Sequence, residues 1–322
     1  MRVAVLGQGS IGRRHAGNLL ELGHEVIAWD PVAGVLDGTT SAASLEDALG
    51  DADAAIIASP SSEHAGQAQL ALEYGCHTLV EKPLALTATD AEPLGALADE
   101  RGLVLGVAMN LRFHPGVIAV REAVRSGTIG TPLTARAWFG SWLPGWRPGT
   151  DYRHSYSARR DLGGGVLLDA IHEIDYLTWI LGPIASVSAK LATVSGLELD
   201  VEDVAQLQLG FASGVQGVLS LDYLDRSYDR GCRVVGAEGT VAWSFPDGRV
   251  TVLVAGADTT SLEVPRDVIG TYPLEVAAFI TATLDRLAPS TSGPEGVSSL
   301  RVVEAARSSA ETSRMVTVAN SR

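Results

Sequence analysis

Short apolar runs and amphipathic segments alternate through the first third of the chain. Runs that resemble buried strands occupy residues 3–6, 25–29, 54–58, 78–80 and 103–107. Between them, residues 62–74 and 87–101 carry Ala and Leu at helical spacing. Strands that alternate with helices of this length are typical of a parallel sheet covered on both faces. We therefore predict a first α/β domain at residues 1–120.

The pattern changes after residue 120, where strands follow one another with short turns between them. Strands are predicted at residues 131–139, 186–194, 204–211, 215–222, 232–235, 241–245, 250–254 and 315–318, and helices at 166–181, 272–287 and 295–313. Closely spaced strands joined by tight turns indicate an antiparallel sheet. We predict a second, α+β domain at residues 121–322 with a large open, mostly antiparallel sheet. Its last helix is expected to pack back on the first domain.

Composition and charge narrow the function classes. The 322 residues are 46% hydrophobic and 19% charged, with a formal net charge of −14. So acidic a surface repels phosphate backbones and anionic headgroups, so neither nucleic acid nor membrane is an expected partner. No apolar run approaches the roughly 20 residues that cross a bilayer, and Met1-Arg2 leads straight into a strand rather than a secretory signal. With Cys76 and Cys232 as its only cysteines, the protein is expected to be cytoplasmic.

A glycine motif links the first predicted strand to the first helix. Its residues are Gly7, Gly9, Ser10, Ile11 and Gly12, and Asp30 ends the next strand 18 positions later. Such a turn lets backbone amides and a helix N-terminus bind a pyrophosphate, and the carboxylate binds the ribose hydroxyls of NAD. We therefore predict NAD in preference to NADP. Arg13 and Arg14 weaken that preference, because a nearby cation accommodates the extra phosphate of NADP. A glycine turn in a non-binding domain is the alternative.

Two further groups carry candidate chemistry. Glu81-Lys82-Pro83 ends a predicted parallel strand, where a lysine can donate to a substrate oxygen or simply occupy a solvated turn. On the predicted helix 166–181, Asp169, His172 and Tyr176 share one stripe, which suits proton transfer. An ordinary solvated helix face is equally compatible. No second histidine or cysteine accompanies His172 on this helix, so no metal site is predicted.

Taken together, these motifs resemble the Gfo/Idh/MocA oxidoreductases, the relatives of glucose–fructose oxidoreductase and inositol dehydrogenase. The resemblance rests on the glycine motif, on Glu81-Lys82-Pro83, and on Gly163-Gly164-Gly165 followed by Asp169 and His172. It covers essentially the whole chain, and it implies a nicotinamide-dependent dehydrogenase or reductase of sugars or polyols. The substrate is expected between the nicotinamide and the open face of the second sheet. A broad apolar sheet face, buried in a homodimer or homotetramer, is also implied.

The resemblance also assigns roles to individual residues. Lys82 is implied to be catalytic, with a cis bond to Pro83, and His172 to bind the reacting hydroxyl and help take its proton, accompanied by Asp169. Here Asp169 precedes His172 by three residues rather than the family's usual four. The cofactor is implied to contact Ser59, Pro60, His64, Glu81 and Lys82. The segment that contains Arg112 corresponds to the family's domain junction, and we include Arg112 among the substrate-binding residues.

A basic, aromatic segment at residues 141–160 is the predicted substrate loop. It has four arginines against the single Asp151, a local charge of +3, and it contributes Trp146, Tyr152, Arg153 and Tyr156 as candidate contacts. Arginine binds carboxylate or phosphate in bidentate fashion, so the loop favours an anionic, nucleotide-linked or highly hydroxylated sugar. Alternatively, the arginines pair with acidic neighbours, or the loop supports a subunit contact.

The leading hypothesis is reversible oxidation of a sugar or polyol hydroxyl with NAD. In this hypothesis His172 removes the proton, Lys82 stabilises the developing oxyanion, and Asp169 and Tyr176 orient the base or a ring hydroxyl. Two alternatives remain open on the same fold. One is a redox-neutral glycosidase or eliminase that retains NAD, and the other is a non-catalytic NAD-sensing regulator.

Overall fold

The computed structural model describes residues 1–319, which form two compact units. The first unit comprises residues 1–110 and 269–300, and the second comprises 111–268 together with the remaining C-terminal residues. The sequence predicts a single division after residue 120, whereas the first unit also includes this later segment. Within residues 1–319, no helix combines the length and the apolar character that crossing a bilayer requires.

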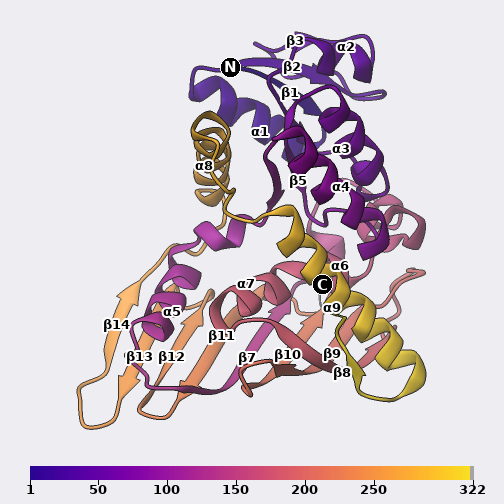
Figure 1. Cartoon of the computed structure of the whole chain (residues 1–322). Helices are drawn as coiled ribbons and strands as arrows, with labels where there is room; N and C mark the ends of the chain where they lie inside the picture. The colour runs from indigo at the N-terminus through magenta and orange to yellow at the C-terminus, as the bar shows by residue number, and fades with distance from the viewer. Residues whose placement is uncertain (320–322) are drawn as a thin grey trace. The chain divides into compact units, whose positions relative to one another are not determined.

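A six-stranded parallel sheet forms the centre of the first unit, as predicted (Figure 1). The strands are ordered β3-β2-β1-β4-β5-β6. Their bounds are β1 Arg2–Leu6, β2 Glu25–Trp29, β3 Thr40–Ser41, β4 Ala54–Ile57, β5 His77–Glu81 and β6 Leu105–Ala108. Residues of β1, β4 and β5 are almost fully buried, which explains their continuous apolar runs.

Helices cover this sheet. They are α1 Ser10–Glu21, α2 Leu45–Gly50, α3 His64–Glu73, α4 Ala88–Arg101, α8 Thr271–Asp285 and the first turns of α9 Gly293–Thr312. Side-chain caps begin two of them, since Ser44 accepts from the Asp47 amide and Thr87 from the Asp90 amide. Helix α8 comes late in the sequence, yet its Val276, Phe279 and Ile280 belong to the same core as β1.

A nine-stranded mixed sheet forms the second unit, ordered β14-β13-β12-β11-β7-β10-β9-β8-β15. Every neighbouring pair is antiparallel except β7 and β10. The bounds are β7 Pro132–Gly140, β8 Ile184–Ala192, β9 Val204–Phe211, β10 Gln216–Asp222, β11 Asp229–Gly236, β12 Gly239–Ser244, β13 Arg249–Val254, β14 Thr260–Glu263 and β15 Val316–Thr317. The predicted large, mostly antiparallel sheet is confirmed.

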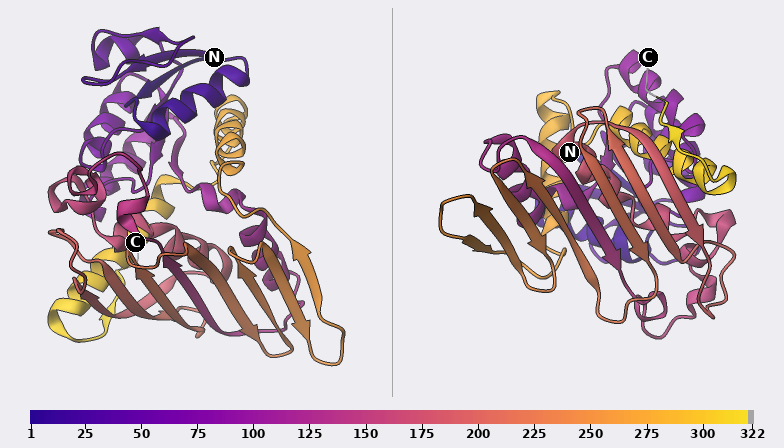
Figure 2. Two further views of the ribbon diagram at one scale, coloured as in Figure 1. Left: turned by 180° about the vertical axis from the view of Figure 1, so that it is seen from behind. Right: turned by 90° about the horizontal axis from the view of Figure 1, so that it is seen from below.

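Helices α5 Pro115–Arg125, α6 Val166–Asp169 and α7 Ile171–Leu181 lie on one face of this sheet, and its other face carries no helix (Figure 2). Strand β3, helices α2 and α5, and strand β14 were not predicted. The predicted continuous helix 166–181 is wrong. It breaks at Ala170, whose backbone angles of φ −96° and ψ 30° are not helical.

One row across the centre of the bare sheet face carries charged, polar and apolar side chains. Ladder registers place Arg136 of β7 opposite Arg233 of β11, with Val218 and then Gln208 on the same row. The alternate residues of β7, such as Ala135, face the helices and are buried. The centre of this face therefore carries two adjacent cations beside the exposed Val218.

Candidate active site

The residues predicted to bind a cofactor gather at one edge of the first sheet. Strands β1, β4 and β5 are neighbours and run parallel, so Gly7, Ser59 and Lys82 follow strand ends on the same edge. Ligands of open α/β sheets bind outside this carboxyl edge. The tertiary structure thus brings together motifs that lie more than 70 positions apart in the sequence.

Two of the three glycines in the turn are closely packed, and the third, Gly9, faces open space. Gly7 has φ +92°, and a Cβ there would lie 2.6 Å from the Ala58 backbone. A Cβ on Gly12 would lie 1.9 Å from the Gly7 carbonyl oxygen, whereas one on Gly9 meets nothing within 4 Å. Gly9 also begins α1 without a side-chain cap, so the amides of Ser10 and Ile11 belong to an uncapped helix start. This open, electropositive cradle fits a dinucleotide pyrophosphate.

Three backbone amides hold the Asp30 carboxylate in place. Its Oδ2 accepts from the Gln8 amide at 2.7 Å, and its Oδ1 accepts from Val32 and Ala33 at 2.8 and 2.6 Å. Burial raises the pKa of this carboxyl, but the three backbone donors outweigh burial, so the pKa lies below its ordinary value. Asp30 is therefore a carboxylate at neutral pH.

The two arginines beside the glycine turn already have partners. Arg13 donates from Nε to the Gln8 carbonyl at 3.0 Å and from its terminal nitrogen to the Gly34 carbonyl. The guanidinium carbon of Arg14 lies 4.7 Å from the centre of the Tyr272 ring. Both arginines therefore have partners within the first unit.

Lys82 lies between Glu81 and Pro83, and each of these two residues contacts a buried histidine. On one side, Glu81 Oε1 lies 2.8 Å from His15 Nε2. On the other, His64 Nδ1 lies 2.6 Å from the Pro83 carbonyl oxygen, and Nε2 lies 2.9 Å from that of Ser59. The Lys82–Pro83 peptide is cis, as the resemblance implied. His64 thus contacts the backbone after both β4 and β5. Pro60 is the N-cap of the short 3-10 turn Ser61–Glu63, which precedes His64.

His15 and Glu81 also belong to a candidate metal group that sequence reasoning missed. Ligand atoms of His15, Glu81 and Glu275 all lie within 4.8 Å of one another. Burial raises the pKa of Glu81, but its hydrogen bond to His15 and the nearby charges lower it overall. The sequence offered no signal for this group, because Glu275 comes from the distant helix α8.

In the second unit, the break at Ala170 separates Asp169 from His172. Asp169 is 7% exposed, and its Oδ2 accepts a 2.5 Å hydrogen bond from Tyr223 Oη. Tyr223 is fully buried at the end of β10, and its hydroxyl also lies 3.4 Å from the Ser157 carbonyl oxygen. His172 is 8% exposed at the start of α7. Sequence reasoning missed Tyr223, which no motif marks.

The predicted polar stripe of this helix is not a solvated face. Tyr176 is fully buried, its hydroxyl lies 3.3 Å from the Gly231 carbonyl oxygen, and burial raises its pKa well above the ordinary value. Asp175 binds Arg112 in bidentate fashion, with contacts of 2.9 and 2.7 Å between side chains at most 4% exposed. These partners argue against the predicted substrate contacts of Tyr176 and Arg112.

The basic loop is neutralised within its own unit. Arg153 pairs with Asp151 and Glu198, and Arg159 pairs with Asp161. The Asp200 carboxylate accepts a hydrogen bond from the backbone amide of Arg160, and the Asp200 backbone carbonyl accepts one from the Arg160 guanidinium. The carboxylates of Asp161, Glu198 and Asp200 balance the +3 counted for residues 141–160. Pairing with acidic neighbours, one of the two sequence alternatives, describes Arg153 and Arg159, whereas the Arg160 side chain donates to a backbone carbonyl.

The aromatic residues of the loop also have partners. Trp146 donates to Ser141 Oγ at 2.8 Å, and its ring stacks edge-on with Tyr223. Tyr152 accepts from the Glu198 amide at 3.1 Å. The guanidinium of Arg147 lies 5.1 Å from the Tyr156 ring centre. Through Trp146 the loop contacts Tyr223, the residue that donates a hydrogen bond to Asp169.

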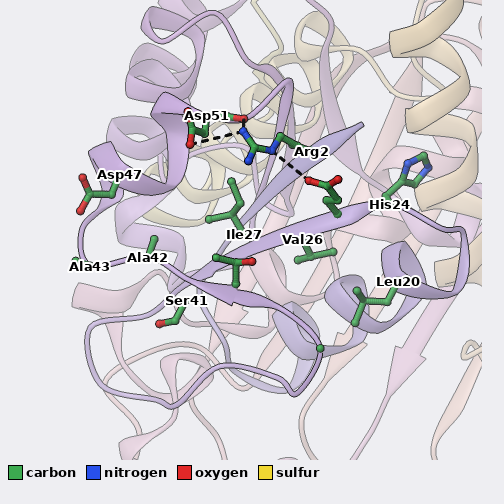
Figure 3. Close-up of a pocket in the computed structure, with 13 residues that line it drawn as sticks. Arg2, Leu20, His24, Val26, Ile27, Ser41, Ala42, Ala43, Asp47 and Asp51 are labelled. Atoms are coloured by element: carbon green, nitrogen blue, oxygen red, sulfur yellow. Dashed lines mark hydrogen bonds and ion pairs between the residues drawn. The ribbon is translucent and has the colours of Figure 1, made fainter.

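A separate cavity of about 520 Å³ lies beside β2 and β3 (Figure 3). It is lined by Arg2, Glu25, Thr40 and Asp51 among others, and Arg2 pairs with Glu25 and Asp51 across it. None of the motif residues lines it. Among its lining residues, Arg2 and Glu25 are the first residues of β1 and β2. They lie at the opposite end of these strands from the candidate cofactor site.

Comparisons with known proteins identify the family of both parts of the chain. Residues 1–109 match the family described as "Oxidoreductase family, NAD-binding Rossmann fold", and residues 117–242 match the "GFO/IDH/MocA C-terminal domain". The chain is 32% identical to 1,5-anhydro-D-fructose reductase of Ensifer adhaerens over 273 residues, which cover 81% of this chain and 78% of that protein.

Solved structures share the fold over the whole chain. Levoglucosan dehydrogenase in complex with NADH superposes with a TM-score of 0.88, 21% identity and full coverage of both chains. The WlbA dehydrogenase of Bordetella pertussis, in complex with NADH and UDP-GlcNAcA, gives a TM-score of 0.87 at 24% identity, covering 100% of this chain and 98% of that one. At these identities the likeness shows the fold alone.

Proposed function

The chain belongs to the GFO/IDH/MocA oxidoreductases with an NAD-binding Rossmann fold, and we propose that it oxidises a hydroxyl, or reduces the keto group, of a neutral sugar or polyol with NAD in preference to NADP. The observation that carries the proposal is the carboxyl edge of the first sheet. There the open glycine cradle, the Asp30 carboxylate and Lys82 follow β1, β2 and β5 of the same parallel sheet.

NAD preference is supported by charge at Asp30. Its carboxylate favours two ribose hydroxyls and repels the 2′-phosphate of NADP. Arg13 is bound to two backbone carbonyls, so it offers that phosphate little compensation. Bound NAD supplies the hydride acceptor or donor, and the protein supplies orientation and electrostatics.

Proton and charge handling fall to three side chains. The Lys82 ammonium donates to the reacting oxygen and stabilises its negative charge, and His172 takes the hydroxyl proton in the oxidative direction. The Asp169 carboxylate accepts a hydrogen bond from Tyr223, which holds it in place, and it contributes a negative charge to this part of the second unit. The composition supports a specific role for Lys82: of 24 basic residues only Lys82 and Lys190 are lysines. An ammonium can shift its pKa and donate as a compact point charge, which a guanidinium does less readily.

A neutral substrate is favoured over an anionic one. The loop arginines already pair with Asp151, Asp161 and Glu198, so binding an anionic sugar would require these pairs to break. One relative is named 1,5-anhydro-D-fructose reductase, after a neutral sugar. We further propose that the chain works as a homo-oligomer, which light scattering of the purified protein tests.

The proposal is tested by initial rates with a substrate panel. The panel contains 1,5-anhydro-D-fructose with NADH, levoglucosan and myo-inositol with NAD, and UDP-GlcNAcA as the anionic comparison, each repeated with the 2′-phosphorylated cofactor. Lys82→Met should lower kcat at least about 100-fold while NAD still binds, and Lys190→Met is the matched control. Stoichiometric NADH formation separates net dehydrogenation from redox-neutral elimination. Full activity of Lys82→Met, or a preference for UDP-GlcNAcA, contradicts the proposal.

A further inference from the structure

His64 sits between the two strand ends that flank the candidate site. It begins α3 and is only 1% exposed. Its Nδ1 lies 2.6 Å from the carbonyl oxygen of Pro83, immediately after Lys82. Its Nε2 lies 2.9 Å from the carbonyl oxygen of Ser59, which follows β4. The ring therefore lies between the backbone segments that follow β4 and β5, within hydrogen-bond distance of both.

The surrounding contacts leave His64 as the side chain that spans this gap. Ser59 Oγ donates to Gln67 Oε1 at 2.6 Å, which ties Ser59 to α3 but not to β5. On the other side of Lys82, Glu81 is tied to His15 of α1. Pro83 has no amide hydrogen, so its backbone is held through its carbonyl. His64 Nδ1 lies 2.6 Å from that carbonyl oxygen.

We propose that His64 of α3 is a positioning residue for Lys82: its ring donates to the Pro83 carbonyl and so fixes the backbone from which the Lys82 ammonium extends. This assigns His64 a role other than direct contact with the cofactor. It rests on the proposed function of Lys82. No contact of His64 with substrate is required.

The chemistry of the ring supports this role. Carbonyl oxygens only accept hydrogen bonds, so donation to both requires both ring nitrogens to carry hydrogen. Burial lowers the pKa of His64, the two carbonyls and Glu81 raise it, Lys82 lowers it, and the net pKa lies below the ordinary value. A hydrogen on Nδ1, the atom with the shorter contact, makes the hydrogen bond to the Pro83 carbonyl, and the link to Lys82 needs only this one donor.

The first experiment compares kinetics and stability in matched histidine variants. His64→Phe keeps a planar ring and removes both nitrogens, while His64→Gln keeps an amide donor. The control is His77→Phe, because His77 begins the same strand and its Nδ1 accepts from the Val104 amide at 3.0 Å. We expect His64→Phe to lower kcat about 10- to 100-fold with the KM for NAD within about threefold. His64→Gln should recover part of kcat.

The second experiment observes Lys82 directly. Reductive ¹³C-methylation labels two side chains, Lys82 and Lys190, besides the terminal amine, and Lys190→Arg assigns the signals. We expect the Lys82 resonance and its pH titration to move towards those of exposed Lys190 in His64→Phe, and to stay unchanged in His77→Phe.

The outcomes separate the two proposals. Full activity of Lys82→Met would reject the catalytic role of Lys82, yet the Lys82 resonance in His64→Phe would still decide the link. A Lys82 signal that is the same in wild type and folded His64→Phe overturns the positioning role. So does a loss of kcat in His77→Phe that equals the loss in His64→Phe at the same fall in Tm.

Discussion

The buried ion pair beside His172 gives the sharpest test of what holds the second unit together. Glu173 of α7 lies 2.8 Å from Arg230 Nε of β11, with side chains 0% and 7% exposed. The guanidinium also lies 4.5 Å from the centre of the Phe139 ring. Burial lowers the pKa of Arg230, but Glu173 and its other neighbours raise it further, so the guanidinium stays charged. The perturbation is Glu173→Gln, which leaves that charge without its counterion.

The magnitude follows from distance and burial. At 2.8 Å and an effective dielectric constant of about 20, the attraction is about 6 kcal/mol. Desolvation offsets much of it in the native pair, but the cost of Arg230 burial remains when the carboxylate is removed. We therefore expect Glu173→Gln to lower the free energy of unfolding by about 3–5 kcal/mol. The double variant Glu173→Gln with Arg230→Met should lose clearly less than the sum of the two single losses.

Urea unfolding followed by fluorescence and by circular dichroism measures these values, and coincidence of the two probes checks two-state behaviour. The control is Asp161→Asn, which removes an ion pair with Arg159 whose side chains are 59% and 48% exposed. Exposed pairs contribute less than about 1 kcal/mol. If Glu173→Gln costs no more than Asp161→Asn, or if the double variant is strictly additive, the reasoning from burial is refuted.

Three further predictions follow from local geometry. His114 Nδ1 accepts from the Gly116 amide at 3.0 Å, and burial lowers the pKa of His114 from 6.5 to about 4. Below pH about 6.5 the unfolded chain therefore binds a proton that the folded chain does not, so stability should fall by up to about 2 kcal/mol between pH 7 and pH 5. His114→Asn, which preserves the cap, should flatten that slope in urea titrations, and an unchanged slope would contradict the assignment. Asp30→Asn should raise the ratio of kcat/KM for NADP to that for NAD at least about tenfold, as initial rates with both cofactors will show. Gly165 has φ +108°, and its Cβ would lie 2.4 Å from Glu202 Oε1, so Gly165→Ala should cost more than about 2 kcal/mol in urea unfolding, whereas Gly196→Ala, which meets nothing within 4 Å, should not.

The local pattern of the chain was enough to predict the parallel sheet, the glycine turn and the large second sheet. Each of these depends on short-range information. Buried parallel strands read as continuous apolar runs, and a turn such as that at Gly7 demands a residue without a side chain. The same information identified Asp30 and Lys82 as residues that follow strands. Their common location at one sheet edge then followed from parallel topology.

Only the tertiary structure decided the partners of the polar residues. Tyr176 lies on α7 together with His172, but its packing against Gly231 places it in the core. Long-range pairing also binds Arg112 to Asp175, at a separation that no sequence pattern reports. The charge of residues 141–160 is balanced by carboxylates about 40 positions later. Side-chain periodicity predicts which face a residue occupies, whereas the partner across that face comes from another element, and only the folded chain brings the two together.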